Sequence, residues 1–291
     1  DKPFMRACSA YDSTLSTALI NFYCTARAEL FPAAGPASSE IVGVPTPDVE
    51  EEGERVKIFI NHYLTKIDKC YYPDSERLLL YVGLLGCAFR KVYQDPVLNR
   101  PVARLITPLD FIINHHTTSI LNSSRLTEVQ YLSRKDVLLR QESRHFIKFD
   151  LPATNEDADS GTQETQKIIN KIEGVNAEAA ENRSLFTFYE VHTDLSPDEV
   201  ENNIDDENEI AVPRPYVITI CDATKKIVSI RRSWKEGDDK YKRLEYYVHY
   251  YYLPGFGIYS MGLIHLMGSN AITLTSILRQ TIDAATLKNF P

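Results

Sequence analysis

The stretch Leu78-Leu79-Leu80-Tyr81-Val82-Gly83-Leu84-Leu85-Gly86-Cys87-Ala88-Phe89-Arg90-Lys91-Val92-Tyr93 decides the fold class, because its hydrophobic pattern changes partway along. The nearly uninterrupted apolar run from Leu78 to Phe89 indicates a buried helix, and the alternation from Phe89 to Tyr93 indicates a strand. The apolar run is far shorter than the roughly 20 residues that cross a bilayer, and it contains two glycines. The sequence therefore predicts a protein that combines helices with strands.

Two amphipathic helices are predicted before this stretch. Between Tyr11 and Phe31 apolar residues recur at three- and four-residue steps, and Pro32 follows. After an extended connection over 32–47, a second helix is predicted to start near Pro47–Asp48, with acidic residues in its first turn, and to run to about Asp68. We expect this helix to bury an apolar stripe formed by Val56, Phe59, Ile60, Tyr63, Leu64 and Ile67.

Short strands dominate the chain that follows, at 102–106, 111–114, 127–132, 185–192, 216–222, 227–232 and 246–253, with a helix at about 133–141. The strands at 216–222 and 227–232 form a predicted hairpin, which an aromatic third strand at 246–253 follows in the chain. Two polar stretches, 152–182 and 198–209, are expected to be loops. After a glycine-rich segment, a long helix is predicted from Ser269 or Asn270 onward.

These elements define an α+β fold, with N-terminal helices packed on mixed short strands, then an antiparallel β segment and a long helix. The predicted organisation has an N-terminal helical and mixed-strand part over 1–145 and a polar insert over 146–184. An antiparallel β segment over 185–260 follows, and 261–291 form a glycine-rich turn with a long helix leading toward a stem-like region. Since the chain does not begin with Met, we expect neither end to be a natural boundary.

Composition narrows the function classes. The chain has 43% hydrophobic and 25% charged residues, which is typical of a globular protein. Its net charge of −8 opposes tight nonspecific binding to duplex DNA, which depends on Lys and Arg, but is compatible with a channel through which DNA slides. Five scattered cysteines without a Cys-x-x-Cys pair favour reduced thiols, and the N-terminus shows no export signal.

Tests for catalytic and binding chemistry are mostly negative. The sequence has no phosphate-binding loop, no Gly-x-Ser-x-Gly and no His-Glu-x-x-His, and the adjacent pair His115-His116 would point to opposite faces of a strand. Gly255-Phe256-Gly257 is better explained by a tight turn or close chain approach than by a dinucleotide site. The mixed-charge cluster from Arg231 to Arg243 favours a solvated hairpin or a subunit contact. We therefore expect no enzyme activity, cofactor or metal.

Several long motifs resemble a family of portal proteins from tailed bacteriophages that have large portal chains. The motifs are Arg27–Pro32, Tyr72–Asp74 with Leu84–Pro96, Val248–Tyr259 with Gly262–Gly268, and Leu278–Leu287, and the resemblance covers roughly residues 20–145 and 185–291. The polar inserts at 152–182 and 198–209 depart from the family pattern, which also continues beyond Pro291. Structural or interface roles are expected for the strand 246–253 and the helix 270–289, with the candidate residues Tyr250, Tyr252, Pro254, Gly255, Gly257, Arg279, Gln280 and Asp283.

The resemblance implies a portal-like, dodecameric head-to-tail connector at one capsid vertex of the virion, assembled in the host cytoplasm. Viral DNA would enter through this ring during packaging and leave during ejection, without sequence-specific binding. The implied partners are other copies of the chain, the terminase large subunit, the major capsid or scaffolding protein, and head–tail adaptor proteins, with no membrane. The alternatives are another phage head or tail-adaptor structural protein, a DNA-binding or partitioning module, and a virion nuclease or peptidase.

Overall fold

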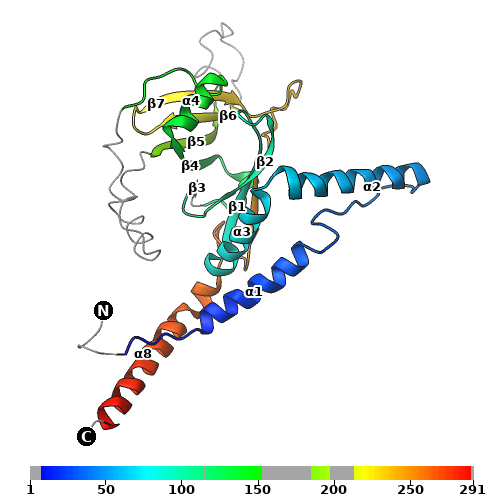
Figure 1. The fold of residues 1–291 in the computed structure, drawn as a ribbon. Helices are drawn as coiled ribbons and strands as arrows, with labels where there is room; N and C mark the ends of the chain where they lie inside the picture. The colour runs from blue at the N-terminus through cyan, green and yellow to red at the C-terminus, as the bar shows by residue number, and fades with distance from the viewer. Residues whose placement is uncertain (1–7, 115, 153–184, 197–212, 290–291) are drawn as a thin grey trace. The chain divides into compact units, whose positions relative to one another are not determined.

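A computed structural model describes residues 8–114, 116–152, 185–196 and 213–289 of the chain (Figure 1). The chain divides into two compact units. The first unit consists of Asp1–Lys91, Ala103–Thr107 and Val248–Pro291, and the second consists of Val92–Val102 and Pro108–Tyr247. Helices and two sheets are both present, so the α+β class is confirmed.

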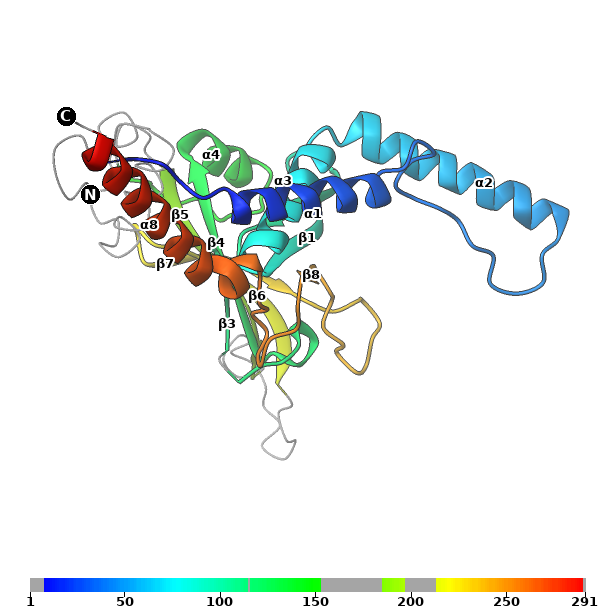
Figure 2. The same ribbon diagram turned by 90° about the horizontal axis from the view of Figure 1, so that it is seen from below.

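The first unit contains the long helices. These are α1 (Thr14–Leu30), α2 (Pro47–His62), α3 (Tyr71–Leu85) and α8 (Leu263–Asn289), and a π-helical turn, Tyr63–Ile67, continues α2. Helix α1 packs against both α3 and α8, and Figures 1 and 2 show it lying beside them. A Cβ on Gly83 would lie 2.7 Å from the Phe22 ring, so this glycine allows the close approach of α1 to α3.

The core of the first unit forms where α3 passes into the first strand. Leu78, Val82 and Ala88 are buried together there, and Phe22, Tyr250 and Tyr252 pack against them. Gly86 ends α3 in the left-handed region at φ 99°, a conformation that glycine adopts without steric cost. Strand β1 (Cys87–Asp95) starts at the next residue. The helix-to-strand transition predicted from the sequence is thus confirmed, but the helix ends at Leu85 and the strand begins at Cys87, before the predicted change at Phe89.

The second unit is built on a five-stranded antiparallel sheet. Its strand order is β3-β4-β5-β6-β7, with β3 Phe111–Ile113, β4 Arg125–Ser133, β5 Leu185–Leu195, β6 Arg214–Cys221 and β7 Lys226–Arg232. Helix α4 (Arg134–Glu142) packs on β4 and begins with a capping box formed by Ser133 and Asp136. A short 3₁₀ turn, Ile120–Asn122, precedes β4. Phe146, Phe186, Phe188, Val137 and Val228 fill the core.

A second sheet has the order β2-β1-β8, with β2 Arg100–Ile106 and β8 Tyr247–Tyr251. The chain passes from one unit to the other within β1, within β2, between Thr107 and Pro108, and after the first residue of β8. The aromatic strand predicted over 246–253 is present as β8, and it pairs with β1 rather than with the β6–β7 hairpin. Such pairing connects residues far apart in sequence, so local pattern does not reveal it.

Two helix predictions also need correction. The apolar stripe of α2 is not buried, because Val56, Phe59 and Ile60 are 49%, 64% and 39% exposed, and no residue of α2 is buried in the described chain. Helix α8 begins at Leu263, six residues before the predicted start, and includes Gly268. The loops predicted over 153–182 and 198–209 lie outside the described residues. Among the described helices, none is both long and apolar enough to cross a membrane.

Candidate functional site

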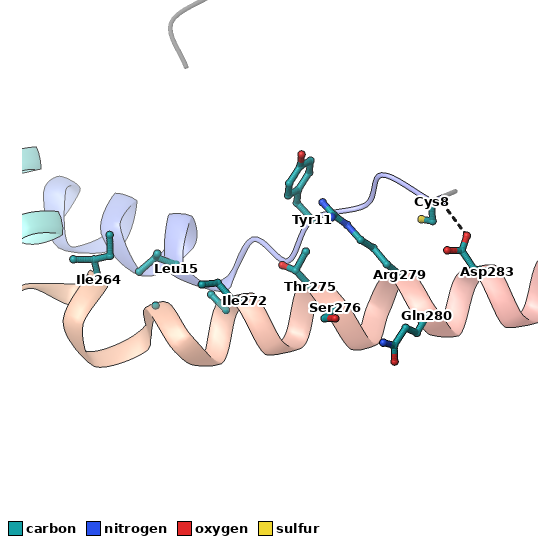
Figure 3. Close-up of a pocket in the computed structure, with 12 residues that line it drawn as sticks. Cys8, Tyr11, Leu15, Ile264, Ile272, Thr275, Ser276, Arg279, Gln280 and Asp283 are labelled. Carbon is teal, nitrogen blue, oxygen red and sulfur yellow. Dashed lines mark hydrogen bonds between the residues drawn. The ribbon is translucent and has the colours of Figure 1, made fainter. Parts of the chain in front are cut away.

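A groove runs between the segment Cys8–Leu15 and helix α8, within the first unit (Figure 3). Its volume is about 600 Å³. Apolar side chains line one part and polar side chains the other, and the lining residues are Cys8, Tyr11, Leu15, Ile264, Gly268, Ala271, Ile272, Thr275, Ser276, Arg279, Gln280 and Asp283. Three of the candidate residues predicted from the sequence, Arg279, Gln280 and Asp283, therefore lie in one groove.

Side chains spaced four residues apart on α8 hold the N-terminal segment. Arg279 Nε donates to the Ala10 carbonyl at 2.8 Å, and its guanidinium lies 4.5 Å from the centre of the Tyr11 ring. Asp283 Oδ1 accepts from the Cys8 amide at 2.9 Å, and Thr275 Oγ1 accepts from the Asp12 amide at 3.1 Å. Because positions four apart share a helix face, α8 satisfies backbone groups along the whole segment.

The candidate residues Pro254, Gly255 and Gly257 lie in a tight loop. Leu253 and Met261 close this loop through a β-bridge, in which the Met261 amide donates to the Leu253 carbonyl at 2.9 Å. A Cβ on Gly255 would lie 2.5 Å from the Tyr259 carbonyl oxygen, so close chain approach explains this glycine. Nothing in the structure explains Gly257, since a Cβ there would meet no atom within 4 Å.

Two further candidates, Tyr250 and Tyr252, face the interior of their own unit. The Tyr252 ring packs edge-on against Phe22 with centroids 5.1 Å apart. The guanidinium of buried Arg90 lies 5.9 Å from the Tyr250 ring centre, and Arg90 also donates to Ser75 Oγ at 2.6 Å. Both tyrosines therefore pack within the chain, apart from the groove residues.

Helix α8 leaves most of its apolar residues uncovered. Of its 27 described residues only Leu263 is buried. Eight large apolar side chains are exposed by 38% to 74%, namely Ile264, Leu266, Ile272, Leu274, Ile277, Leu278, Ile282 and Leu287. At ~120 Å² of apolar surface for a fully exposed Leu or Ile side chain, they present on the order of 500 Å² to solvent. A surface of this size and character is typical of an interaction site.

The same region lacks charged residues. From Tyr246 to Leu278 the chain contains no Asp, Glu, Lys or Arg over 33 residues, although charged residues make up 25% of the whole sequence. At that overall frequency about eight would be expected. Exposed members of the stretch include Tyr251, Phe256 and Tyr259. Depletion of charge combined with exposed aromatic residues is characteristic of the core of a protein–protein interface.

Sequence reasoning missed a buried polar network in the second unit. Tyr247 Oη donates to Glu128 Oε2 at 3.0 Å and lies 3.0 Å from His192 Nε2, which in turn lies 3.0 Å from Glu190 Oε1. Glu190 also accepts from Gln130 Nε2 at 3.0 Å. Burial, with the nearby carboxylates, raises the pKa of Tyr247 well above its usual value, so its hydroxyl stays protonated as a donor.

A sequence signal for this network exists in the strand alternation. Inward positions of β5 are Phe186, Phe188, Glu190 and His192, all buried, so a carboxylate and an imidazole continue an otherwise aromatic face. Glu128 is the cross-strand partner of Glu190. Two facing carboxylates disfavour a sheet unless donors separate them, and here Tyr247, His192 and Gln130 supply the hydrogen bonds. The network can stabilise the unit internally.

Three arginines of the basic cluster from Arg231 to Arg243 contact groups of their own unit. Arg231 Nη2 lies 3.8 Å from Glu190, Arg232 lies over the Trp234 ring, and Arg243 donates to the Ser123 carbonyl at 2.7 Å. These contacts hold members of the basic cluster against their own unit. Over the described residues, no group of three or more His, Cys, Asp or Glu side chains could hold a metal ion.

Comparison with known proteins gives no family assignment: no protein-family model matches the chain, and no curated protein matches it.

Proposed function

We propose that this chain is a structural subunit of a closed homo-oligomeric ring of the portal kind, a conduit for viral DNA rather than an enzyme. In this role the ring occupies a capsid vertex of the virion, admits double-stranded DNA during packaging and releases it on ejection. Its other partners are the terminase large subunit, the capsid or scaffolding protein and the head–tail adaptor proteins. The sequence motifs that resemble phage portal proteins are the reason why we propose a portal rather than another kind of ring.

The structural observation that carries the proposal is helix α8. Its exposed apolar side chains, together with the uncovered stripe of α2, are poorly suited to a chain that remains alone in water. Neighbouring copies would bury these surfaces. Because a ring uses two different patches on each subunit, several uncovered faces fit this assembly better than the one self-complementary patch of a two-fold dimer.

The test is electron microscopy together with native mass spectrometry on the longest natural form of the chain. Rings of uniform mass with a central channel wide enough for duplex DNA, ~20 Å or more across, would support the proposal. A persistent monomer or two-fold dimer would overturn it. Rings that form without a continuous DNA-sized channel would favour a different head or tail-adaptor component.

A further inference from the structure

Two apolar features of the first unit are exposed to solvent. The first is Phe256, at the tip of the loop Leu253–Met261, whose side chain is fully exposed at 104%. The second is the groove beside α8, where Leu15, Ile264, Ala271 and Ile272 form the apolar part of the lining. One feature presents an aromatic ring to solvent, and the other offers an apolar recess.

The loop holds Phe256 in a defined position. The bridge between Leu253 and Met261 fixes its two ends, and Ile258 and Ser260 on its return side are buried. The close approach of Gly255 to the Tyr259 carbonyl restricts the turn further. A side chain displayed by an ordered loop loses little conformational entropy on binding, which is the property of an interface anchor.

The groove can accept an aromatic side chain. Its volume of about 600 Å³ exceeds that of one phenyl ring, and an added Cβ on Gly268 would make only an ordinary contact, 3.5 Å from Ile264. Arg279 and Asp283 lie farther along α8, and they form hydrogen bonds with the backbone of the chain's own segment Cys8–Ala10. The apolar part beside Ile272 is left open, since Ile272 is 74% exposed.

The surrounding surface has the composition of a subunit contact. One partner would contribute apolar area of α8, which exposes on the order of 500 Å² in all, and the other would contribute Phe256 with ~200 Å², so these residues form part of the ~800 Å² that each side of a standard interface buries. Phe256 lies in the charge-free stretch 246–278, and so do the apolar groove residues Ile264, Ala271 and Ile272. The chemistry therefore favours another uncharged protein surface as the occupant, and not a nucleic acid.

We propose that Phe256 of one copy of this chain inserts into the α8 groove of the next copy, head to tail. This inference rests on the proposed ring and names one of its contacts. Each subunit offers one anchor and one groove, so the contact repeats from copy to copy around a closed ring. Phe256 and Ile272 belong to opposite sides of the same interface.

Two substitutions test the contact, one on the anchor side and one on the groove side. Both replace exposed residues, so the core stays intact. Phe256→Ala deletes the anchor, and Ile272→Glu places a charge in the apolar part of the groove. Val42→Ala and Val42→Glu are the matched controls, because Val42 is 99% exposed and lies outside the charge-free stretch. We expect each interface variant to weaken subunit association by ~30-fold or more, as loss of an interface hot spot does, and both controls to assemble like the wild type.

Mixing the two variants tests the head-to-tail geometry. A Phe256→Ala subunit keeps its groove, and an Ile272→Glu subunit keeps its anchor, so the mixture should form heterodimers and no larger species. Native mass spectrometry, with one variant isotopically labelled, separates these dimers from homodimers. A mixture that stays monomeric, or variants that assemble like the wild type, would overturn the contact.

A photo-crosslinking residue at position 256 identifies the occupant directly. The expected product is an intermolecular crosslink to peptides from 264–283 or 8–15 of another copy. Crosslinks to other surfaces of the chain, or to lipid in a vesicle control, would overturn the inference even where the rings are intact. Failure of the wild-type chain to form rings would instead overturn the proposed function, so the two failures are distinguishable.

Discussion

At the scale of single residues, the buried hydroxyl of Tyr247 connects two parts of the polar network. It donates to Glu128, whose carboxylate is 8% exposed, and contacts His192, which is 2% exposed. A buried carboxylate that loses a donor keeps its desolvation cost. The Tyr247 hydroxyl should therefore matter far more than hydroxyls on the surface.

We predict that Tyr247→Phe lowers the free energy of unfolding by about 1–3 kcal/mol. Tyr251→Phe is the matched control, since Tyr251 is 58% exposed, and it should change the value by less than ~0.5 kcal/mol. Urea denaturation followed by circular dichroism measures both. Equal effects of the two substitutions would contradict a stabilising role for the network.

His249 gives the first unit a dependence on pH. Its ring stacks on buried Phe89 with centroids 4.9 Å apart, and its Nε2 has no hydrogen-bond partner in the described chain. Burial lowers the pKa of His249 below its usual value. Because the folded pKa lies below the unfolded one, the stabilisation is fully present above about pH 6.5 and is lost as the pH falls toward the folded pKa.

His249→Phe should remove this dependence while keeping the stacked ring. The difference in unfolding free energy between variant and wild type should grow in favour of the variant as the pH falls from about 7 to about 5. Urea titrations at several pH values measure this difference, in which the shared contributions of the other histidines cancel. A difference that stays constant with pH would refute the role of His249.

At the scale of elements, the turn at Gly86 constrains the junction of α3 and β1. A Cβ at this position would lie 2.4 Å from the Gly262 nitrogen and from the Ser260 carbonyl oxygen, and the backbone is left-handed. Neither backbone atom can move without displacing the start of α8. Gly86 thus joins α3 to β1, and its lack of a side chain leaves room for the backbone of residues 260–262.

We predict that Gly86→Ala destabilises the protein by about 2 kcal/mol or more. Gly257→Ala is the paired control, because a Cβ there meets nothing, and it should stay within ~0.5 kcal/mol of the wild type. Thermal unfolding of both variants provides the measurement. Similar melting temperatures for the two would show that the close approach at Gly86 is relaxed in solution.

Local sequence patterns predicted the individual helices and strands well, but they did not predict which of these elements pack or pair with one another. Helix α1 and the strands β6 and β7 follow from the spacing of apolar residues, which reflects the period of the backbone itself, and α3 follows from a nearly continuous apolar run. The same spacing in α2 identified an apolar face but not what covers it, and that face is exposed. The pairing of β8 with β1, and of Glu128 with Glu190, depends on register between distant segments, which no local window contains.

The sequence predicted candidate site residues, but it did not predict which of them lie together in the structure. Arg279, Gln280 and Asp283 were expected on one helix and do line one groove. Tyr250 and Tyr252 lie on either side of exposed Tyr251 at the end of β8, yet they pack against their own core, because successive residues of an extended chain face opposite sides. The role of Phe256 as an exposed residue could not be read from its glycine neighbours alone.

At the scale of the whole molecule, the charge-free stretch should make assembly insensitive to salt. Ionic strength screens contacts between exposed charges, whereas apolar contacts persist or strengthen. We predict that the fraction of assembled chain stays constant or rises between about 0.05 and about 0.5 M NaCl, measured by light scattering after size-exclusion chromatography. A several-fold fall would mean that ion pairs elsewhere hold the subunits together.

The first unit is built from three separate stretches of chain, and this sets the order in which its parts become available for folding during synthesis. Helix α1 packs against α8, yet α1 ends at Leu30 and α8 begins at Leu263. At roughly 5–20 residues synthesised per second, about 10–50 s separate the two. The second unit, which lies between them in the sequence, emerges complete first. Helix α1 can therefore reach α3 early, whereas its contact with α8 forms only after the second unit has been translated.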